Sequence, residues 1–178
     1  MSSKTKKMIS YAFLELAKKK NIDKITVKDI VEKVDITRQT FYYHYKDIMD
    51  VIEWSLEQKM SEILEKSLQA ESMEKSIREL LSLVEENTDI FNKLMNSQKR
   101  ELIERLLVET IRSYMKKMID RTELFMDMRR SDLEVAINYH SFALAGILFE
   151  ITNKTKPVDL DLLSEKIYLL ITGKMFNS

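Results

Sequence analysis

The sequence predicts an all-helical protein of about nine helices, and three observations support this. The 178 residues include only two Gly and one Pro, a composition that is poor in turn residues and favours helices. Apolar residues make up 44% and charged residues 33%, enough to build a sizeable core. Apolar side chains also recur at intervals of three and four residues. We expect an N-terminal three-helix helix-turn-helix unit, joined by a long fourth helix to a C-terminal helical bundle.

The first apolar stripe predicts an amphipathic helix near the N-terminus. Its members are Ile9, Ala12, Phe13 and Leu16, at positions i, i+3, i+4 and i+7. Lysines at positions 18–20 suit the carboxyl end of a helix, where the dipole favours cations. We therefore expect this helix to end near Asn21.

A second, shorter stripe predicts a helix of about two turns. Its members are Val27, Ile30, Val31 and Val34. Thr26 and Asp29 have the spacing of a capping box at its start, in a weak form because Asp takes the place of Glu. A tight break at residues 35–36 follows, and Thr37 can cap a third helix that runs to about Tyr45. Two short helices around a tight turn form a helix-turn-helix.

The remaining helices follow without a clear linker. A long helix begins near residues 46–47 and runs toward Ala70. Further helices are expected at about 73–87, 89–96, 98–119, 131–153 and 159–173. This pattern divides the chain into an N-terminal domain at 1–47 and a helical domain at 48–178.

The composition argues against several classes of protein. The chain has no Cys, so we expect neither disulfides nor a thiolate metal site. The two histidines, His44 and His140, lie almost a hundred residues apart, and no His-Glu-x-x-His run occurs. The basic start, MSSKTKKMISYAF, is not followed by a signal-peptide pattern, and the apolar run at 142–149 is too short to cross a membrane. We expect a cytoplasmic protein that is not an enzyme and has no cofactor, metal or membrane partner.

The net charge of zero hides an uneven distribution. Residues 1–47 hold eleven Lys/Arg against six Asp/Glu, a balance of +5, so the rest of the chain carries −5. Such an asymmetry indicates a polyanionic partner for the N-terminal part. A chance excess of solvated lysines explains it equally well on charge alone.

The segment TRQTFYYHYKD, residues 37–47, is crowded with rings and hydrogen-bonding groups. If it is helical, Phe41 and Tyr45 share one face and can pack, with Ile36, against the second apolar stripe. The other faces carry Arg38, Gln39, two tyrosines and Lys46, which are groups that bind phosphates or read base edges. The alternative is a surface helix with amphipathic tyrosines.

The run ITVKDIVEKVDITRQTFYYHYKDIMDVIEW resembles the DNA-binding region of the TetR family of bacterial transcriptional regulators. The resemblance covers about residues 8–57, and its specific core is TFYYHYK at 40–46. Within the family, FYYHYKDIMDVIEW resembles the branch that includes activators of dihydroxyacetone kinase operons. Two features differ: Val34-Asp35 stand where the family often has Ala-Gly, and Gln39 replaces a small residue. We expect these differences to alter the operator and leave the fold intact.

The resemblance implies a homodimer that binds a double-stranded, (pseudo)palindromic DNA operator. It assigns phosphate contacts to Thr37, Thr40, Tyr43, His44 and Lys46, and major-groove positions to Lys28, Arg38, Gln39 and Tyr42. Arg38 is the candidate reader of guanine and Gln39 of adenine, because each pairing makes two hydrogen bonds. A packing role for His44 stays open. The resemblance also makes residues 1–47 the DNA-binding domain and residues 48–178 a ligand-binding and dimerisation domain.

The last two helices are the candidate dimer interface. Residues 142–149 are apolar on every side, as expected of a helix that contacts both its own core and a partner. The predicted interface residues are Ala143, Gly146, Ile147, Leu163, Ile167 and Leu170. A single chain with one fully buried central helix is the alternative.

The resemblance further implies an effector, either a small molecule or a partner protein, that acts on the C-terminal domain. The candidate lining residues are Tyr114, Met118, Phe125, Tyr139, His140 and Phe142, although each is equally suited to an ordinary core. The alternative to a regulator is an all-helical interaction or ligand-binding module that does not bind DNA specifically.

Overall fold

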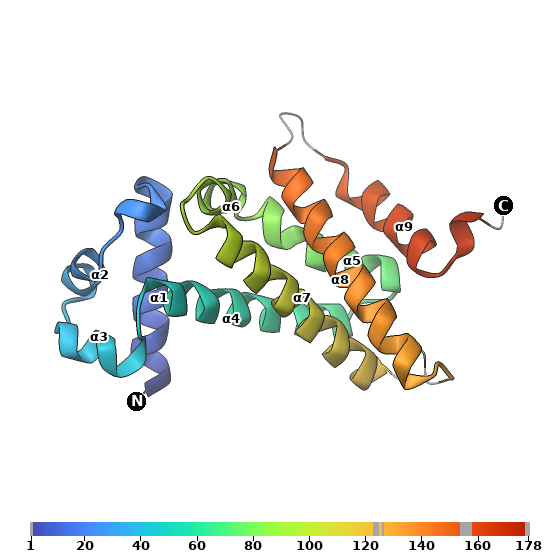
Figure 1. Ribbon diagram of the computed structural model, residues 1–178, viewed down its shortest axis with the longest axis horizontal. Helices are drawn as coiled ribbons and strands as arrows, with labels where there is room; N and C mark the ends of the chain where they lie inside the picture. The colour runs from blue at the N-terminus through green and yellow to red at the C-terminus, as the bar shows by residue number, and fades with distance from the viewer. Residues whose placement is uncertain (1, 123–124, 126, 154–157, 177–178) are drawn as a thin grey trace. The chain divides into compact units, whose positions relative to one another are not determined.

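The structure is a computed structural model that describes residues 2–122, 125, 127–153 and 158–176. Within these residues the chain forms nine α-helices, two short 3-10 helices and no strand, so the all-α prediction is confirmed (Figure 1). The α-helices are α1 Ser2–Lys19, α2 Val27–Val34, α3 Arg38–His44, α4 Ile48–Leu68, α5 Met73–Glu85, α6 Thr88–Met95, α7 Arg100–Thr122, α8 Arg130–Asn153 and α9 Leu160–Ile171. The 3-10 helices are η1 Ile22–Lys24 and η2 Lys174–Phe176.

The chain forms two compact units. Unit 1 comprises Met1–Gln58 and Asp89–Glu104, and unit 2 comprises Lys59–Thr88 and Arg105–Ser178. Helices α4 and α7 each contribute residues to both units. The two domains expected at 1–47 and 48–178 stay a prediction about function.

The core of unit 1 is built on the predicted apolar face of α1. Ile9, Ala12 and Phe13 are buried there, and α2 and α3 both pack against α1 (Figure 1). Ile30 of α2 and Phe41 of α3 are fully buried. Helices as short as α2 and α3 are marginal alone in water, so this shared core is what keeps them folded.

Polar contacts join α6 and the start of α7 to the same core. The ammonium group of Lys93 donates to the backbone carbonyls of Ala17 and Lys18, at 2.7 and 2.5 Å. These carbonyls belong to the last turn of α1, where a cation is favourable. The backbone N–H of Gln98 donates to the carboxylate of Asp23 at 3.1 Å. Residues about 75 positions apart in sequence therefore fix the carboxyl end of α1.

The turn between α2 and α3 depends on Asp35, whose φ of 53° lies in the left-handed region. Asp tolerates this conformation better than most residues other than Gly and Asn. The N–H groups of Asp35 and Ile36 both donate to the carbonyl of Val31, which closes the carboxyl end of α2. The tight turn predicted from the sequence thus forms without a glycine.

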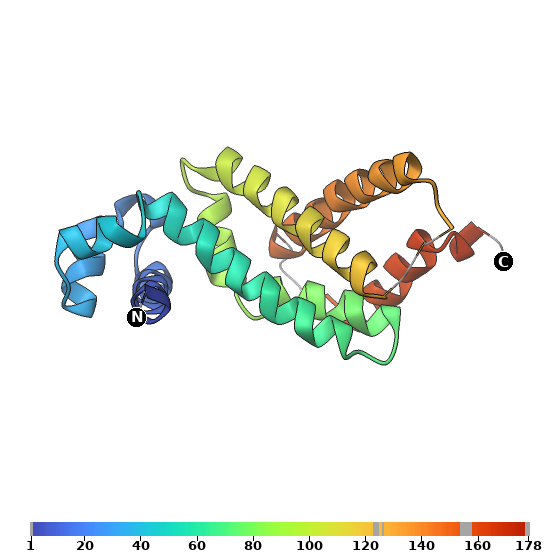
Figure 2. The same ribbon diagram turned by 90° about the horizontal axis from the view of Figure 1, so that it is seen from below.

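Unit 2 has its core among α5, α7, α8 and α9. Helix α5 buries Ile77, Leu80, Leu81 and Val84 and packs against α9 and α8, which can be followed in Figures 1 and 2. Leu148 of α8 is also fully buried. Ser67 of α4 and Ser76 of α5 exchange hydrogen bonds between hydroxyl and carbonyl groups, at 3.3 and 2.9 Å.

Candidate nucleic-acid interface and effector cavity

Helix α3 is anchored by the two aromatic residues that the sequence singled out. Phe41 and Tyr45 are both buried, and their ring centroids lie 6.0 Å apart, which confirms the predicted burial. Tyr45 nevertheless lies one residue beyond the helix, in an extended conformation. Its hydroxyl donates to the carbonyl of Lys6 at 3.1 Å, and its ring contacts Trp54 edge-on at 6.1 Å. Tyr45 therefore joins α3 to α1 and α4 and is not simply a second helical contact to α2.

Side-chain caps set the starts of α2 and α3. The hydroxyl of Thr26 accepts from the N–H of Asp29 at 3.2 Å, and the carboxylate of Asp29 accepts from the N–H of Thr26 at 2.9 Å. The predicted capping box is therefore present. The hydroxyl of Thr37 accepts from the N–H of Thr40 at 3.1 Å and lies 2.9 Å from the Thr40 hydroxyl. Both candidate phosphate-binding threonines thus meet at the amino end of α3.

The start of α4 is fixed in a similar way. The backbone N–H of Lys46 donates to the carboxylate of Asp50 at 2.9 Å, and the N–H of Asp50 donates to the carboxylate of Asp47 at 3.0 Å. These bonds hold the junction between α3 and α4. They leave the exposed Lys46 ammonium group uninvolved in the junction.

The remaining face of α3 is exposed and its polar groups are free. Tyr42 and Tyr43 are 58% and 81% exposed, and Arg38 and Gln39 are exposed as well. Within the described residues, the side chains of Arg38, Gln39 and Lys46 make no ion pair or hydrogen bond. A helix that served only to pack the core would not need two large exposed tyrosines beside unpaired donors.

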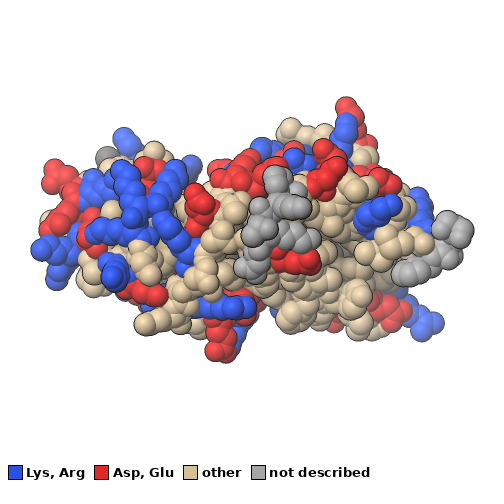
Figure 3. All heavy atoms as spheres, turned by 90° about the horizontal axis from the view of Figure 1, so that it is seen from above, with Lys and Arg blue, Asp and Glu red and all other residues tan. Residues whose placement is uncertain are grey.

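The other two candidate DNA contacts, Lys28 and His44, already interact with neighbouring side chains. Lys28 on α2 forms an exposed ion pair with Glu32 at 3.7 Å, a contact weak enough for a phosphate to displace. His44 is half-buried, and its ring lies edge-on to that of Tyr43, with 5.0 Å between the ring centroids. Figure 3 shows that Lys and Arg gather over the N-terminal helices, in line with the excess of positive charge in residues 1–47.

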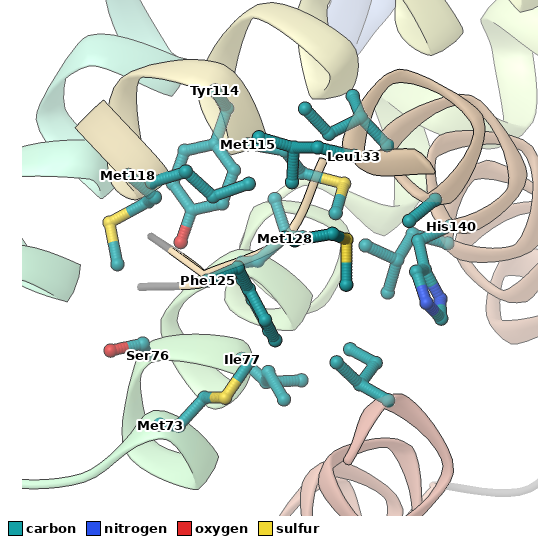
Figure 4. Close-up of a pocket in the computed structure, with 16 residues that line it drawn as sticks. Met73, Ser76, Ile77, Tyr114, Met115, Met118, Phe125, Met128, Leu133 and His140 are labelled. Carbon is teal, nitrogen blue, oxygen red and sulfur yellow. The ribbon is translucent and has the colours of Figure 1, made fainter. Parts of the chain in front are cut away.

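Unit 2 contains a cavity of about 130 Å³ lined by α5, α7, α8, α9 and the turn between α7 and α8. Four of the six predicted lining residues border it, namely Tyr114, Met118, Phe125 and His140 (Figure 4). Tyr139 and Phe142 do not, and they are 70% and 61% exposed. Phe142 lies two residues beyond His140, which is about 200° around a helix. The prediction therefore placed these two aromatic residues on the wrong face of α8.

Burial shifts the pKa values of two polar groups that line the cavity. The hydroxyl of Tyr114 donates to the hydroxyl of Ser67 at 2.8 Å, and burial raises the pKa of Tyr114 to about 12. Burial also lowers the pKa of His140, which favours the neutral imidazole. The sequence did not identify Met73, Met115 and Met128, which also line the cavity. Periodicity shows which residues are internal and cannot show which of them border empty space.

An apolar surface on α8 and α9 is exposed in the single chain. Val135, Tyr139, Phe142 and Gly146 lie along one side of α8, at intervals of three and four residues. Leu162 and Leu170 of α9 are also exposed. We name these six residues the α8–α9 surface.

Of the six predicted interface residues, Gly146 and Leu170 belong to this surface, and the other four differ in exposure. Ala143, Gly146 and Leu170 are exposed, and Ile147 and Leu163 are half-buried. Ile167 is buried in its own chain. A Cβ atom added at Gly146 would meet nothing within 4 Å, so this position is open in the monomer.

By length and composition, the segment Arg130–Thr152 of α8 is also apolar enough to cross a membrane. A helix that packs one side into a protein core passes the same test. Ser141, Leu144 and Leu148 of α8 are buried inside unit 2, which is how a bundle helix packs. Within the described residues, no group of three or more His, Asp or Glu side chains could hold a metal ion.

Comparison with known proteins agrees with this architecture. A TetR-type family model, described as a transcriptional regulator C-terminal region, matches residues 71–173. The chain is 25% identical over 177 residues to the HTH-type dhaKLM operon transcriptional activator DhaS of Lactococcus lactis subsp. lactis (strain IL1403), covering 98% of this chain and 93% of that protein. It is 22% identical over 186 residues to the uncharacterized HTH-type transcriptional regulator YxbF of Bacillus subtilis (strain 168), covering 99% of this chain and 47% of YxbF.

Two solved structures share the fold. The dihydroxyacetone kinase operon activator DhaS superposes with a TM-score of 0.70 at 24% identity, over 96% of this chain and 95% of that one. The crystal structure of Lin0861 from Listeria innocua superposes with a TM-score of 0.71 at 20% identity, over 97% and 92%. The relatives whose names state a function are transcriptional regulators, in agreement with the expectation that the chain is not an enzyme.

Proposed function

The chain belongs to the TetR family of transcriptional regulators, and from this premise we propose that it binds a (pseudo)palindromic operator as a homodimer. Helix α3 is the recognition helix and enters the major groove. The observation that carries the proposal is the exposed face of α3. It combines free guanidinium, amide and phenol groups with an opposite face fixed by Phe41 and Tyr45.

The side chains of this face have distinct roles. Arg38 donates two hydrogen bonds to a guanine, and Gln39 pairs with an adenine. Tyr42 and Lys28 face the groove. Thr37, Thr40, Tyr43, His44 and Lys46 contact phosphates and fix the register of the protein on DNA.

The dimer forms through the α8–α9 surface. Exposed apolar side chains along two neighbouring helices are costly in water and favour burial against a second copy. Two such helix pairs make a four-helix interface, in which Gly146 and Ala143 allow close approach of the partner helix. Ile167 supports the surface from the core side. Two copies of α3 then meet half-sites about one helical turn of DNA, or more, apart.

Regulation acts through unit 2. The cavity supports control by a small molecule, and a partner protein is the second possibility. The name of DhaS refers to activation of a dihydroxyacetone kinase operon, and activation of neighbouring genes is a corresponding role for this chain. We place the protein in the cytoplasm, where its operator is.

The competing function is a helical interaction or ligand-binding module without specific DNA binding. Such a module has little reason to keep Arg38, Gln39 and Tyr42 exposed and unpaired. The α8–α9 surface and the cavity fit both functions, so α3 is where the two differ.

The test is the affinity of the purified protein for DNA upstream of its own gene and its neighbours, measured by fluorescence anisotropy. We expect tighter binding to one of these fragments than to an unrelated duplex, and an affinity that falls steeply as salt increases. Equal, salt-insensitive affinity for all fragments would contradict the proposal. Fragments selected from random DNA would then define the operator.

A further inference from the structure

The wall of the unit 2 cavity is apolar. Among the described residues that line it there is no Lys, Arg, Asp or Glu, and four are the methionines at positions 73, 115, 118 and 128 (Figure 4). Methionine adapts to irregular shapes, and its sulfur packs well against aromatic rings. A charged ligand would lose part of its hydration here and gain no counter-charge from the described wall, which is unfavourable. The cavity therefore selects an uncharged ligand.

Two of the three polar side chains in the wall are already bonded. The Tyr114 hydroxyl donates to Ser67 at 2.8 Å. The Ser76 hydroxyl lies 2.9 and 3.2 Å from the carbonyl oxygens of Ser67 and Ser72. The hydrogens of both hydroxyl groups are thus committed to the protein.

His140 is the polar group left for a ligand. Its imidazole makes no hydrogen bond to the residues that the structure describes, and its one ring contact is edge-on with Tyr139 at 5.1 Å. Figure 4 shows it on the opposite side of the cavity from Tyr114 and Met118. A neutral imidazole offers one donor and one acceptor. Among the described side chains of the wall, His140 is thus the one that keeps a free donor, and it offers a free acceptor as well.

The size of the cavity limits the ligand further. Its volume is about 130 Å³, and an apolar cavity of about 150 Å³ is known to hold benzene. We propose that the cavity binds a small uncharged molecule of one aromatic ring with a single hydroxyl or N–H group, which is hydrogen-bonded to His140. Binding is a property of unit 2, and only its effect on transcription rests on the proposed function.

This ligand class excludes dihydroxyacetone, the triose in the name of the solved structure DhaS. Dihydroxyacetone has three oxygen atoms and almost no apolar surface. The described wall offers one free donor, at His140, which cannot serve all three oxygen atoms, and each polar group left unpaired in a buried site is unfavourable. A triose is therefore not the ligand of this cavity.

Phe125 limits the length of the ligand. It lies in the turn between α7 and α8, and its φ of 65° is in the left-handed region, which bulky residues rarely adopt. Its ring borders the cavity (Figure 4). Removing this ring should open space for a second ring in the ligand.

The test is isothermal titration calorimetry on the full-length protein with three probes. p-Cresol and 4-hydroxybenzoate differ only in a methyl group against a carboxylate, and dihydroxyacetone is the third probe. We expect p-cresol to bind at least about tenfold more tightly than either of the others. Comparable or tighter binding of 4-hydroxybenzoate or dihydroxyacetone would overturn the inference, as would no binding of p-cresol up to about 1 mM.

Three variants and a control locate the binding site. His140→Phe should weaken p-cresol binding by roughly three- to tenfold, the value of one hydrogen bond. Ala136→Leu fills the cavity and should abolish binding, whereas Phe125→Ala should allow the two-ring 2-naphthol to bind. Ser113→Ala, next to Tyr114 but exposed and outside the cavity, should leave p-cresol binding unchanged. Unchanged binding in folded His140→Phe and Ala136→Leu proteins would refute the site.

Measuring operator binding distinguishes a failure of the cavity inference from a failure of the proposed function. A protein that binds operator DNA and not p-cresol contradicts the cavity inference alone. A protein that binds p-cresol and shows no preference for any upstream fragment contradicts the proposed function and leaves the ligand class intact.

Discussion

The hydroxyl of Tyr45 donates a hydrogen bond to the backbone carbonyl of Lys6, 3.1 Å away, across 39 residues of sequence. The ammonium group of Lys6 lies 5.1 Å from the centroid of the same ring, within the range of a cation–π contact. Together these contacts fix the end of α3 against the first turns of α1. The orientation of the exposed face of α3, which we propose reads DNA, therefore depends on Tyr45, which is not part of that face.

Replacing Tyr45 with Phe should destabilise unit 1 by about 1 kcal/mol, because the ring stays and one part-buried hydrogen bond is lost. The single tryptophan, Trp54, contacts this ring, so urea unfolding followed by its fluorescence reports on the site directly. Tyr11→Phe is the matched control, since Tyr11 is exposed on α1. Equal stability of the two variants would show that the hydrogen bond contributes nothing.

The capping box of α2 should make unit 1 sensitive to acid. The pKa of Asp29 is lowered from 3.8 to about 2, chiefly by the hydrogen bond from Lys20 at 2.6 Å and then by those from Thr26. A lowered pKa in the folded state means that this stabilisation is complete above pH 4 and is lost as the pH falls toward 2.

Denaturant midpoints measured between pH 7 and pH 2.5 test this. The wild-type midpoint should fall more steeply below pH 4 than that of Asp29→Asn, which has lost the carboxylate at every pH. Glu32→Gln, on the same helix and with an exposed ion pair at 3.7 Å, should follow the wild type. Parallel curves for wild type and Asp29→Asn would argue against the role of this carboxylate.

Gly146→Lys should convert the proposed dimer into a monomer. The position is open in the single chain, so the substitution leaves the fold intact, and replacing a helical Gly even favours the helix. In the dimer it would bury an unpaired ammonium group. Light scattering at micromolar concentration measures the change. Ser113→Lys, exposed on α7, is the control, and a Gly146→Lys protein that stays dimeric would place the interface elsewhere.

Lys46→Ala should weaken binding to all DNA sequences alike and reduce the slope of log affinity against log salt by about one, as expected for one lost phosphate contact. The backbone of Lys46 is held by Asp50, so the helix junction should remain. Titrations of operator and unrelated duplex at several salt concentrations measure the slope. A loss confined to the operator would assign Lys46 a base-reading role.

The local features of unit 1 could be read from the sequence because they are local in cause. The Thr26/Asp29 capping box, the Thr37 cap and the burial of Phe41 follow from spacings of three and four residues within a few turns. The hydrogen bond from the Tyr45 hydroxyl to Lys6 could not be predicted from such spacings, because Lys6 is brought near only by the packing of α3 on α1.

The cavity of unit 2 was harder to predict for a related reason. Helix α8 is apolar on the side of the cavity and on the exposed side, so its sequence does not distinguish His140 from Tyr139 and Phe142. Packing against α5 decides which side of α8 faces inward. The lining methionines come from α5, α7 and the turn before α8, and no spacing within one helix brings them together.

The central claim, that α3 reads the operator through Arg38, is tested most directly by binding of Arg38→Ala to a set of operators with single base-pair changes. We expect a loss of about 1–3 kcal/mol on the intact operator and almost no loss on the operator already changed at the guanine that Arg38 contacts. Arg129→Ala, exposed in unit 2, should bind like the wild type. An Arg38→Ala protein that loses the same affinity for every operator variant, or loses none, would contradict the claim.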